Sequence, residues 1–250
     1  MIMKENFFES RFIVKNDHSF ENIYMGNGIY WNFADLQKKK GRTWHSRPYE
    51  YFFIVRNILK AYLLGIIMPN KIIDLACGAN HPGYMAMANA ITDKHNIIAL
   101  DIDKGLITNG IEHPMVYKVI GDATNTGFKK ESFDVVSCVS SIEHMPNWKD
   151  GIKEMSRLLK PKGMAFVTMD ISTDTTKTLK HGVDDKTPND YVKEFKTAGL
   201  NLFGSYNGEL PYDAVDSICS KYPLAMNESE LLEGQHSALK AFRMVLRKEG

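Results

Sequence analysis

Short apolar stretches alternate with longer amphipathic segments through the middle of the chain. Five of these stretches are nearly continuous runs of β-branched, aromatic and other apolar residues, which is typical of strands buried on both faces. They cover residues 71–75, 96–101, 115–120, 133–139 and 164–169. Because helix-length segments separate them, the pattern predicts a parallel sheet with helices on both faces.

Helical periodicity marks further segments around these strands. In residues 147–160, apolar residues recur at helical spacing, and Pro161 ends the pattern. The other predicted elements are, in chain order, a helix at 47–64, a helix at 188–198 and strands at 201–205 and 241–247. We expect the two late strands to form an antiparallel edge, which gives a mostly parallel sheet of seven strands.

The first 46 residues are less regular and combine aromatic residues with glycines. Tyr24, Tyr30, Trp31 and Trp44 lie among Gly26, Gly28 and Gly41. Such a segment can form a lid over an active site, and an aromatic strap packed on the sheet edge is the alternative. We therefore predict an N-terminal lid at 1–46 and one globular domain at 47–250, a size that a single core supports.

Charge and cysteine content narrow the class of protein. The 31 Lys and Arg residues nearly balance the 30 Asp and Glu residues, so the formal net charge is +1. This balance argues against nucleic acid and favours a small-molecule substrate. The sequence shows no apolar run of the roughly 18 residues needed for a membrane span. Three scattered cysteines are too few for a disulfide framework, which predicts reduced thiols and a cytoplasmic protein.

Candidate chemistry lies where the predicted strands end. The first strand runs into the small-residue loop Asp74-Leu-Ala-Cys-Gly-Ala-Asn-His-Pro-Gly83, which lets a ligand approach the backbone. The second ends in Asp101, placed to accept hydrogen bonds from both hydroxyls of a ribose. The third ends in Gly121-Asp122-Ala123, which offers a second carboxylate near an adenine ring. The fourth continues into Ser140-Ser-Ile-Glu-His144.

Taken in order, and with Leu158-Leu-Lys-Pro-Lys-Gly163 before the fifth strand, these motifs resemble those of class I S-adenosylmethionine-dependent methyltransferases over roughly residues 71 to 170. The resemblance implies a Rossmann-like α/β fold and S-adenosylmethionine as cofactor. It implies that the cofactor is bound by Asp74, Ala76, Cys77 and Gly78 at its methionine end, by Asp101 and Ile102 at the ribose, by Gly121, Asp122 and Ala123 at the adenine, and by Ser140 near the sulfonium.

The sequence departs from the family pattern at three positions. The family usually has glycine where this chain has Ala76, Asn80 and Lys162. Asn is the residue other than glycine that most easily adopts a left-handed backbone, so Asn80 can keep the turn. The alternative interpretation of Asp101 and Asp122 is that they cap a helix or lie in a solvated loop.

His144 is the candidate catalytic base. It follows the fourth strand, where substrate meets cofactor in this fold, and histidine titrates near neutral pH. Glu143 beside it is the alternative charged group. The candidate substrate contacts are Asp170 at the end of the fifth strand, Trp44 from the lid and Arg47 directly after the lid. The short lid and the Ile142-Glu-His144 segment resemble those of bacterial methyltransferases that act on metabolites or on sugar and cell-surface polysaccharide precursors, which implies a small polar acceptor of this kind. We expect O-methylation because His144 offers a base.

Two other functions stay open. An acidic residue after the second strand also suits a nicotinamide-dependent oxidoreductase, although the loop lacks Gly-x-Gly-x-x-Gly. A non-catalytic binding module that retains the fold is the second, because the loop is altered at Ala76 and Asn80. Nothing in the carboxylate spacing fixes a metal site, so no metal is predicted. The sequence specifies no oligomeric state.

Overall fold

The computed structural model describes about half of the chain in detail. The described residues are 12–14, 22–25, 29–32, 50, 53–54, 57–58, 60–62, 64–79, 96–109, 115–172, 187–203 and 239–250. Their strands are β1 (Phe12–Val14), β2 (Asn22–Met25), β3 (Ile29–Asn32), β4 (Lys71–Leu75), β5 (Asn96–Asp101), β6 (Val116–Ile120), β7 (Phe133–Val139), β8 (Leu159–Ser172), β9 (Leu200–Leu202) and β10 (Leu239–Lys248). Their helices are α5 (Gly105–Asn109), the single-turn η1 (Ile142–His144), α6 (Trp148–Leu158) and α7 (Pro188–Thr197).

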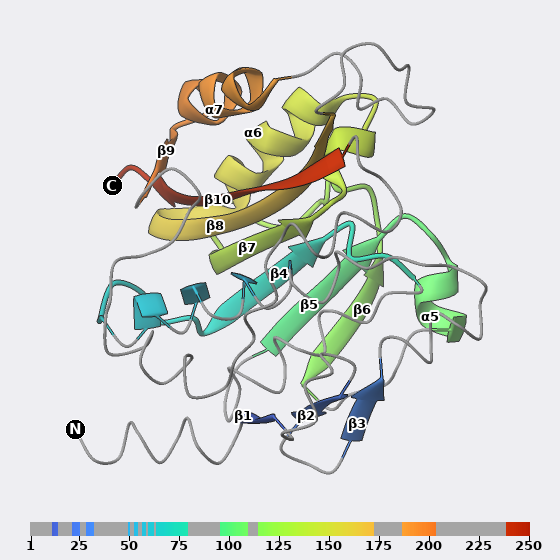
Figure 1. Ribbon diagram of the computed structural model, residues 1–250. Helices are drawn as coiled ribbons and strands as arrows, with labels where there is room; N and C mark the ends of the chain where they lie inside the picture. Colours follow the sequence, from blue (N-terminus) through green and yellow to red (C-terminus); the bar gives the residue numbers. More distant parts are fainter. Residues whose placement is uncertain are drawn as a thin grey trace.

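Seven of these strands form one mostly parallel sheet, as the sequence predicts (Figure 1). Their order is β6-β5-β4-β7-β8-β10-β9. The first five are parallel neighbours, whereas β10 runs antiparallel to both β8 and β9. The order reverses direction between β4 and β7. In open α/β sheets, ligands bind beyond the carboxyl ends of the strands at such a reversal.

The start of β8 differs from the prediction. The strand begins at Leu159, directly after α6, and not at residue 164. Leu159 pairs with Phe133 of β7, and a register shift follows before Val135 pairs with Met164. Within this irregular stretch Lys162 has a φ of +65°, and a side chain on Gly163 would lie 2.9 Å from the Lys160 carbonyl. Lys162 and Gly163 therefore lie in the stretch where the register shifts at the start of β8.

Helices cover both faces of the sheet. In Figure 1, α6 and α7 lie over one side, and the helical residues between 50 and 62, drawn in cyan, lie on the other. The predicted helix at 47–64 is confirmed at the described positions from Glu50 to Tyr62, whose buried members include Phe53, Ile54 and Ile58, whereas Leu64 lies in a turn. On the opposite side, the rings of Trp148 and Tyr191 pack at 4.9 Å and join α6 to α7.

The N-terminal region contains strands that the sequence does not predict. β1, β2 and β3 form a separate three-stranded antiparallel sheet. Trp44 and Arg47 lie outside the described residues. The lid at 1–46 therefore stays a prediction. Among the residues that the structure describes, no helix combines the length and the apolar character that a bilayer crossing requires.

Candidate functional site

The loop after β4 begins the candidate site. Asp74 is fully buried, and its Oδ1 accepts a hydrogen bond of 2.7 Å from the Ser137 hydroxyl of β7. Beyond the strand end, Ala76 has a φ of +52° and Gly78 a φ of +78°. A left-handed backbone disfavours residues with a Cβ, which explains why the family usually has glycine at the position of Ala76. A direct contact of Asp74 with a ligand stays a prediction.

Asp101 joins this loop to the next strand end. Its side chain closes β5 and is 8% exposed. Oδ2 accepts a hydrogen bond of 2.6 Å from the Gly78 amide, and Oδ1 accepts one of 2.9 Å from the Asp103 amide. One carboxylate thus fixes the two loops that follow β4 and β5.

Cys77 lies near the buried carboxylates of Asp74 and Asp101. Burial raises the pKa of its thiol well above the ordinary value, and the charges of Asp74 and Asp101 raise it further, although a backbone hydrogen bond opposes the shift. Cys77 and Cys138 are both free and buried. The Cys77 thiol is therefore neutral at physiological pH, and it lines the loop as a small apolar group.

Asp122 lies at the neighbouring strand end, after β6. Its Oδ1 accepts hydrogen bonds from the Thr124 amide at 2.8 Å and from the Thr124 hydroxyl at 2.7 Å. Asp122 is exposed, Ala123 beside it is buried, and a Cβ on Gly121 would lie 3.2 Å from Leu100 Cδ1. The close packing at Gly121 brings the ends of β5 and β6 together.

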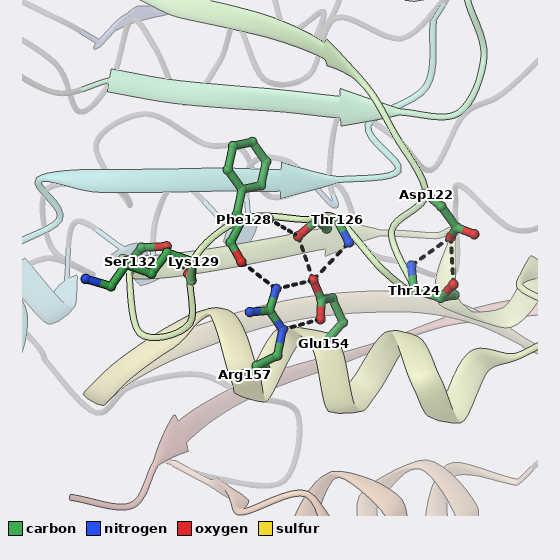
Figure 2. A network of polar contacts seen from close by, with 8 residues as sticks. All are labelled: Asp122, Thr124, Thr126, Phe128, Lys129, Ser132, Glu154 and Arg157. Atoms are coloured by element: carbon green, nitrogen blue, oxygen red, sulfur yellow. Dashed lines mark hydrogen bonds and ion pairs between the residues drawn. The ribbon is translucent and has the colours of Figure 1, made fainter.

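A polar network attaches the Asp122 loop to α6 (Figure 2). Glu154 Oε1 accepts hydrogen bonds from the amide and hydroxyl of Thr126, at 2.9 and 2.6 Å. Arg157 binds both oxygens of Glu154, at 2.6 and 2.7 Å, and its Nη2 also donates to the Phe128 carbonyl. A preformed helix thus fixes the loop that carries Asp122.

This network predicts a dependence of stability on pH. Burial alone would raise the pKa of Glu154, but the hydrogen bonds from Arg157 and Thr126 and the charge of Arg157 together lower it. The stabilisation is therefore complete above the unfolded-state pKa and is lost as pH falls through the lower folded-state pKa. We expect Glu154→Gln to lower the free energy of unfolding by about 2 kcal/mol at pH 7 and by less at acidic pH. Urea titrations at neutral and acidic pH measure both values.

Glu194→Gln provides the matched control. Glu194 forms an ion pair of 3.1 Å with Lys149, whose side chain is 58% exposed, so its loss should cost less than about 1 kcal/mol. A Glu154→Gln effect of equal size at neutral and acidic pH would contradict the assignment.

The end of β7 turns sharply. Ser140 has a φ of +38°. Its amide donates to the carbonyl and the hydroxyl of Thr168 in β8, at 2.9 and 3.1 Å, and its hydroxyl donates to the Glu50 carboxylate. Glu50 is a site residue that the sequence analysis missed. The available signal was a charged residue on the same helical face as Phe53, Ile54 and Ile58, which are buried.

The turn η1 carries the candidate base. Glu143 is 1% exposed, and its Oε1 accepts a hydrogen bond of 2.8 Å from the Asp170 amide of β8. The same oxygen lies 3.9 Å from His144 Nε2, and the His144 side chain is 40% exposed. Glu143 thus anchors the turn, while His144 beside it reaches solvent. The roles of Glu143, His144 and Asp170 toward a substrate stay predictions.

These residues fit a nucleoside at the carboxyl edge. A carboxylate has about four acceptor positions, and the two amide hydrogen bonds to Asp101 leave capacity for a ribose diol. Within the described part of the chain, Asp122 accepts hydrogen bonds through Oδ1 alone, so its other oxygen, Oδ2, can face an adenine amino group. Ile102, next to Asp101, is 71% exposed and can pack against an apolar ring. In the described part of the chain, no group of three or more His, Cys, Asp or Glu could hold a metal.

Comparison with known proteins identifies the family. Residues 73–167 match the model of a methyltransferase domain. Over 165 residues, which are 64% of this chain and 67% of the relative, the chain is 30% identical to the demethylmenaquinone methyltransferase of Staphylococcus haemolyticus. The matches to the first curated relatives span 48% to 61% of those proteins' own length.

Solved structures agree at the level of the fold. A putative sarcosine dimethylglycine methyltransferase from Galdieria sulphuraria has a TM-score of 0.56 at 17% identity, covering 76% of this chain and 83% of that one. A phosphoethanolamine-type N-methyltransferase from Haemonchus contortus, solved with S-adenosylhomocysteine, has a TM-score of 0.52 at 14% identity, covering 74% and 50%. With the sequence matches, these findings show that the chain belongs to the class I S-adenosylmethionine-dependent methyltransferases, whose cofactor is S-adenosylmethionine.

Proposed function

We propose that this chain methylates a small molecule at or beside a hydroxyl group, and that His144 takes the hydroxyl proton. The observation that carries the proposal is the placement of a partly exposed histidine on η1, the turn that follows β7 and is anchored by the buried Glu143. The strand order reverses at this strand, so a cofactor and a second ligand can meet there.

The residues divide the work of alignment and proton transfer. When bound, S-adenosylmethionine supplies an activated methyl group. Asp101 accepts hydrogen bonds from the ribose, and Asp122 accepts one from the adenine amino group, so the nucleoside is held along the ends of β5 and β6. Such positioning can contribute roughly 7 to 11 kcal/mol to the lowering of the barrier. His144 accepts the proton that the acceptor hydroxyl loses, and the nearby Glu143 carboxylate stabilises the imidazolium that forms.

Two acceptor classes fit this arrangement. One is a small polar metabolite or a sugar or polysaccharide precursor, whose deprotonated oxygen forms the new bond to the methyl carbon. The other is a hydroquinone, favoured by the similarity to the demethylmenaquinone methyltransferases of Staphylococcus. Removal of a proton from a hydroquinone hydroxyl increases electron density at the adjacent ring carbon, which can then accept the methyl group. That carbon afterwards loses its hydrogen as a proton, which restores the aromatic ring, so the same base serves methylation at carbon. The near-zero net charge supports a small molecule over nucleic acid.

A product analysis separates these classes. The protein is incubated with S-adenosylmethionine carrying an isotopically labelled methyl group and with a panel of sugars, polar metabolites and reduced quinones, and S-adenosylhomocysteine release is measured. The chemical shift of the transferred methyl group then distinguishes a methoxy group from a ring methyl group. Transfer to an amine or a carboxylate, with no hydroxyl-bearing compound accepted, would contradict the proposal.

A further inference from the structure

Glu50 is a buried carboxylate whose position neither the family motifs nor the proposed function explains. It is 1% exposed and begins the described part of the helix at residues 50–62. Its Oε2 accepts hydrogen bonds from two hydroxyls, that of Ser140 and, at 2.5 Å, that of Thr168. Ser140 directly follows β7 and Thr168 lies within β8, so one side chain of the preceding helix contacts both strands.

Ser140 needs such support. Its left-handed backbone, with a φ of +38°, is unfavourable for a residue that has a Cβ. The Thr168 hydroxyl accepts from the Ser140 amide and donates to Glu50, while the Ser140 hydroxyl also donates to Glu50. The three side chains close a ring of hydrogen bonds around the turn. We call Glu50, Ser140 and Thr168 the β7 turn cluster.

The β7 turn cluster borders the proposed cofactor crevice. Ser141, the next residue, donates from its hydroxyl to the Ala76 carbonyl at 2.9 Å, and Ala76 is itself left-handed, with a φ of +52°. The two irregular turns that follow β4 and β7 are thus directly connected. A change in the Ser140 turn would displace both the loop after β4 and the turn η1.

We infer that Glu50 is a positioning residue for the cofactor crevice: through the Ser140 and Thr168 hydroxyls it holds the left-handed turn that shapes the wall between β4 and β7. It acts through Ser140 and not by touching the methyl group. The inference rests on the family membership and on the proposed cofactor crevice, and it is independent of which acceptor is methylated.

The size of the effect follows from the backbone. Without its carboxylate partner, Ser140 leaves the left-handed conformation for the larger part of the time, because that conformation is disfavoured by roughly tenfold or more for a residue with a Cβ. The apparent dissociation constant of a ligand rises as the fraction of molecules with a binding-competent turn falls. Glu50→Leu, which keeps side-chain volume without oxygens, should therefore weaken S-adenosylhomocysteine binding about tenfold.

Glycine at position 140 provides the decisive test, because glycine adopts a positive φ without strain. In the double variant Glu50→Leu with Ser140→Gly, calorimetry should give a dissociation constant for S-adenosylhomocysteine within about threefold of that of the single variant Ser140→Gly, which lacks the same Ser140 side chain. Glu50→Gln, which keeps an accepting oxygen, should stay within about threefold of the parent. A loss that glycine does not recover, or no loss in Glu50→Leu, would overturn the inference.

A second pair of variants leaves Glu50 in place, should Glu50→Leu fail to fold. Ser140→Ala and Ser140→Gly both remove the hydroxyl, but only alanine retains the Cβ that disfavours the turn. We expect Ser140→Ala to bind S-adenosylhomocysteine about fivefold more weakly than Ser140→Gly, and equal affinities would refute the role of the turn. Because no acceptor is involved, this result is separate from the outcome of the product analysis.

Asn57→Ala is the matched control for simple destabilisation. Asn57 is a fully buried polar residue of the same helix, and its Nδ2 donates to the Phe53 carbonyl at 2.8 Å. Its removal should lower the melting temperature while the affinity for S-adenosylhomocysteine stays unchanged. If Asn57→Ala weakened binding as much as Glu50→Leu, general loosening of the helix would explain both, and the inference would be wrong.

Discussion

Asp101→Asn is expected to weaken S-adenosylhomocysteine binding by on the order of a hundredfold, which is the largest effect on affinity that we predict. Hydrogen bonds to a charged group contribute about 1.5 to 3 kcal/mol each, and we propose that Asp101 accepts two from the ribose. The carboxylate also accepts from the Gly78 and Asp103 amides. An asparagine side chain has a single accepting oxygen, so it cannot satisfy both amides and both ribose hydroxyls.

Asp103→Asn is the matched control for this change. Asp103 is an exposed carboxylate two residues further on, and its Oδ1 accepts from the Gly105 amide at 2.8 Å at the start of α5. Titration calorimetry should show its affinity for S-adenosylhomocysteine close to that of the parent. An Asp101→Asn variant that is folded and binds as tightly as the parent would exclude the ribose role.

His144→Ala is expected to reduce kcat by about 100- to 10,000-fold, the range over which general bases contribute, with cofactor affinity nearly unchanged. The His144 side chain is 40% exposed and lies beside the Glu143 carboxylate, which is fixed by the Asp170 amide. Loss of the imidazole therefore removes the proton acceptor while the anchored turn remains. Steady-state rates and calorimetry on the same samples separate the two quantities.

Asn147→Ala controls for changes in the turn itself. Asn147 is exposed, precedes α6, and makes no side-chain capping hydrogen bond. We expect it to retain the parent kcat. Full turnover by His144→Ala would remove the histidine as base and leave Glu143, the alternative charged group, as the candidate.

The sheet could be predicted from sequence because each of its parallel strands is a short, nearly continuous apolar run. β4, β5 and β7 have the predicted bounds, since residues buried on both faces allow no polar alternation. Because parallel strands end at the same edge of the sheet, the predicted strand bounds alone place Asp101 and Asp122 at its carboxyl edge. The entry of β8 was not predictable, because pairing of Leu159 with Phe133 overrides the local helical pattern.

The contacts around Ser140 could not be predicted in the same way. The bonds from Ser140 and Thr168 to Glu50 join residues separated by 90 and 118 positions in sequence. Hydrophobic periodicity within one segment does not indicate contacts between such distant residues. The one available signal was a charged residue on a buried helical face. The glycine positions of the family are informative in retrospect, because Ala76 and Lys162 both have positive φ values.

A structure of the protein in complex with S-adenosylhomocysteine tests the central claim most directly, by the distances from the ribose hydroxyls to the Asp101 carboxylate. We predict that both hydroxyls lie within hydrogen-bonding distance of Asp101, with the adenine ring beside Asp122 and Ala123. A nucleoside bound elsewhere, with Asp101 still occupied only by the Gly78 and Asp103 amides, would contradict the account.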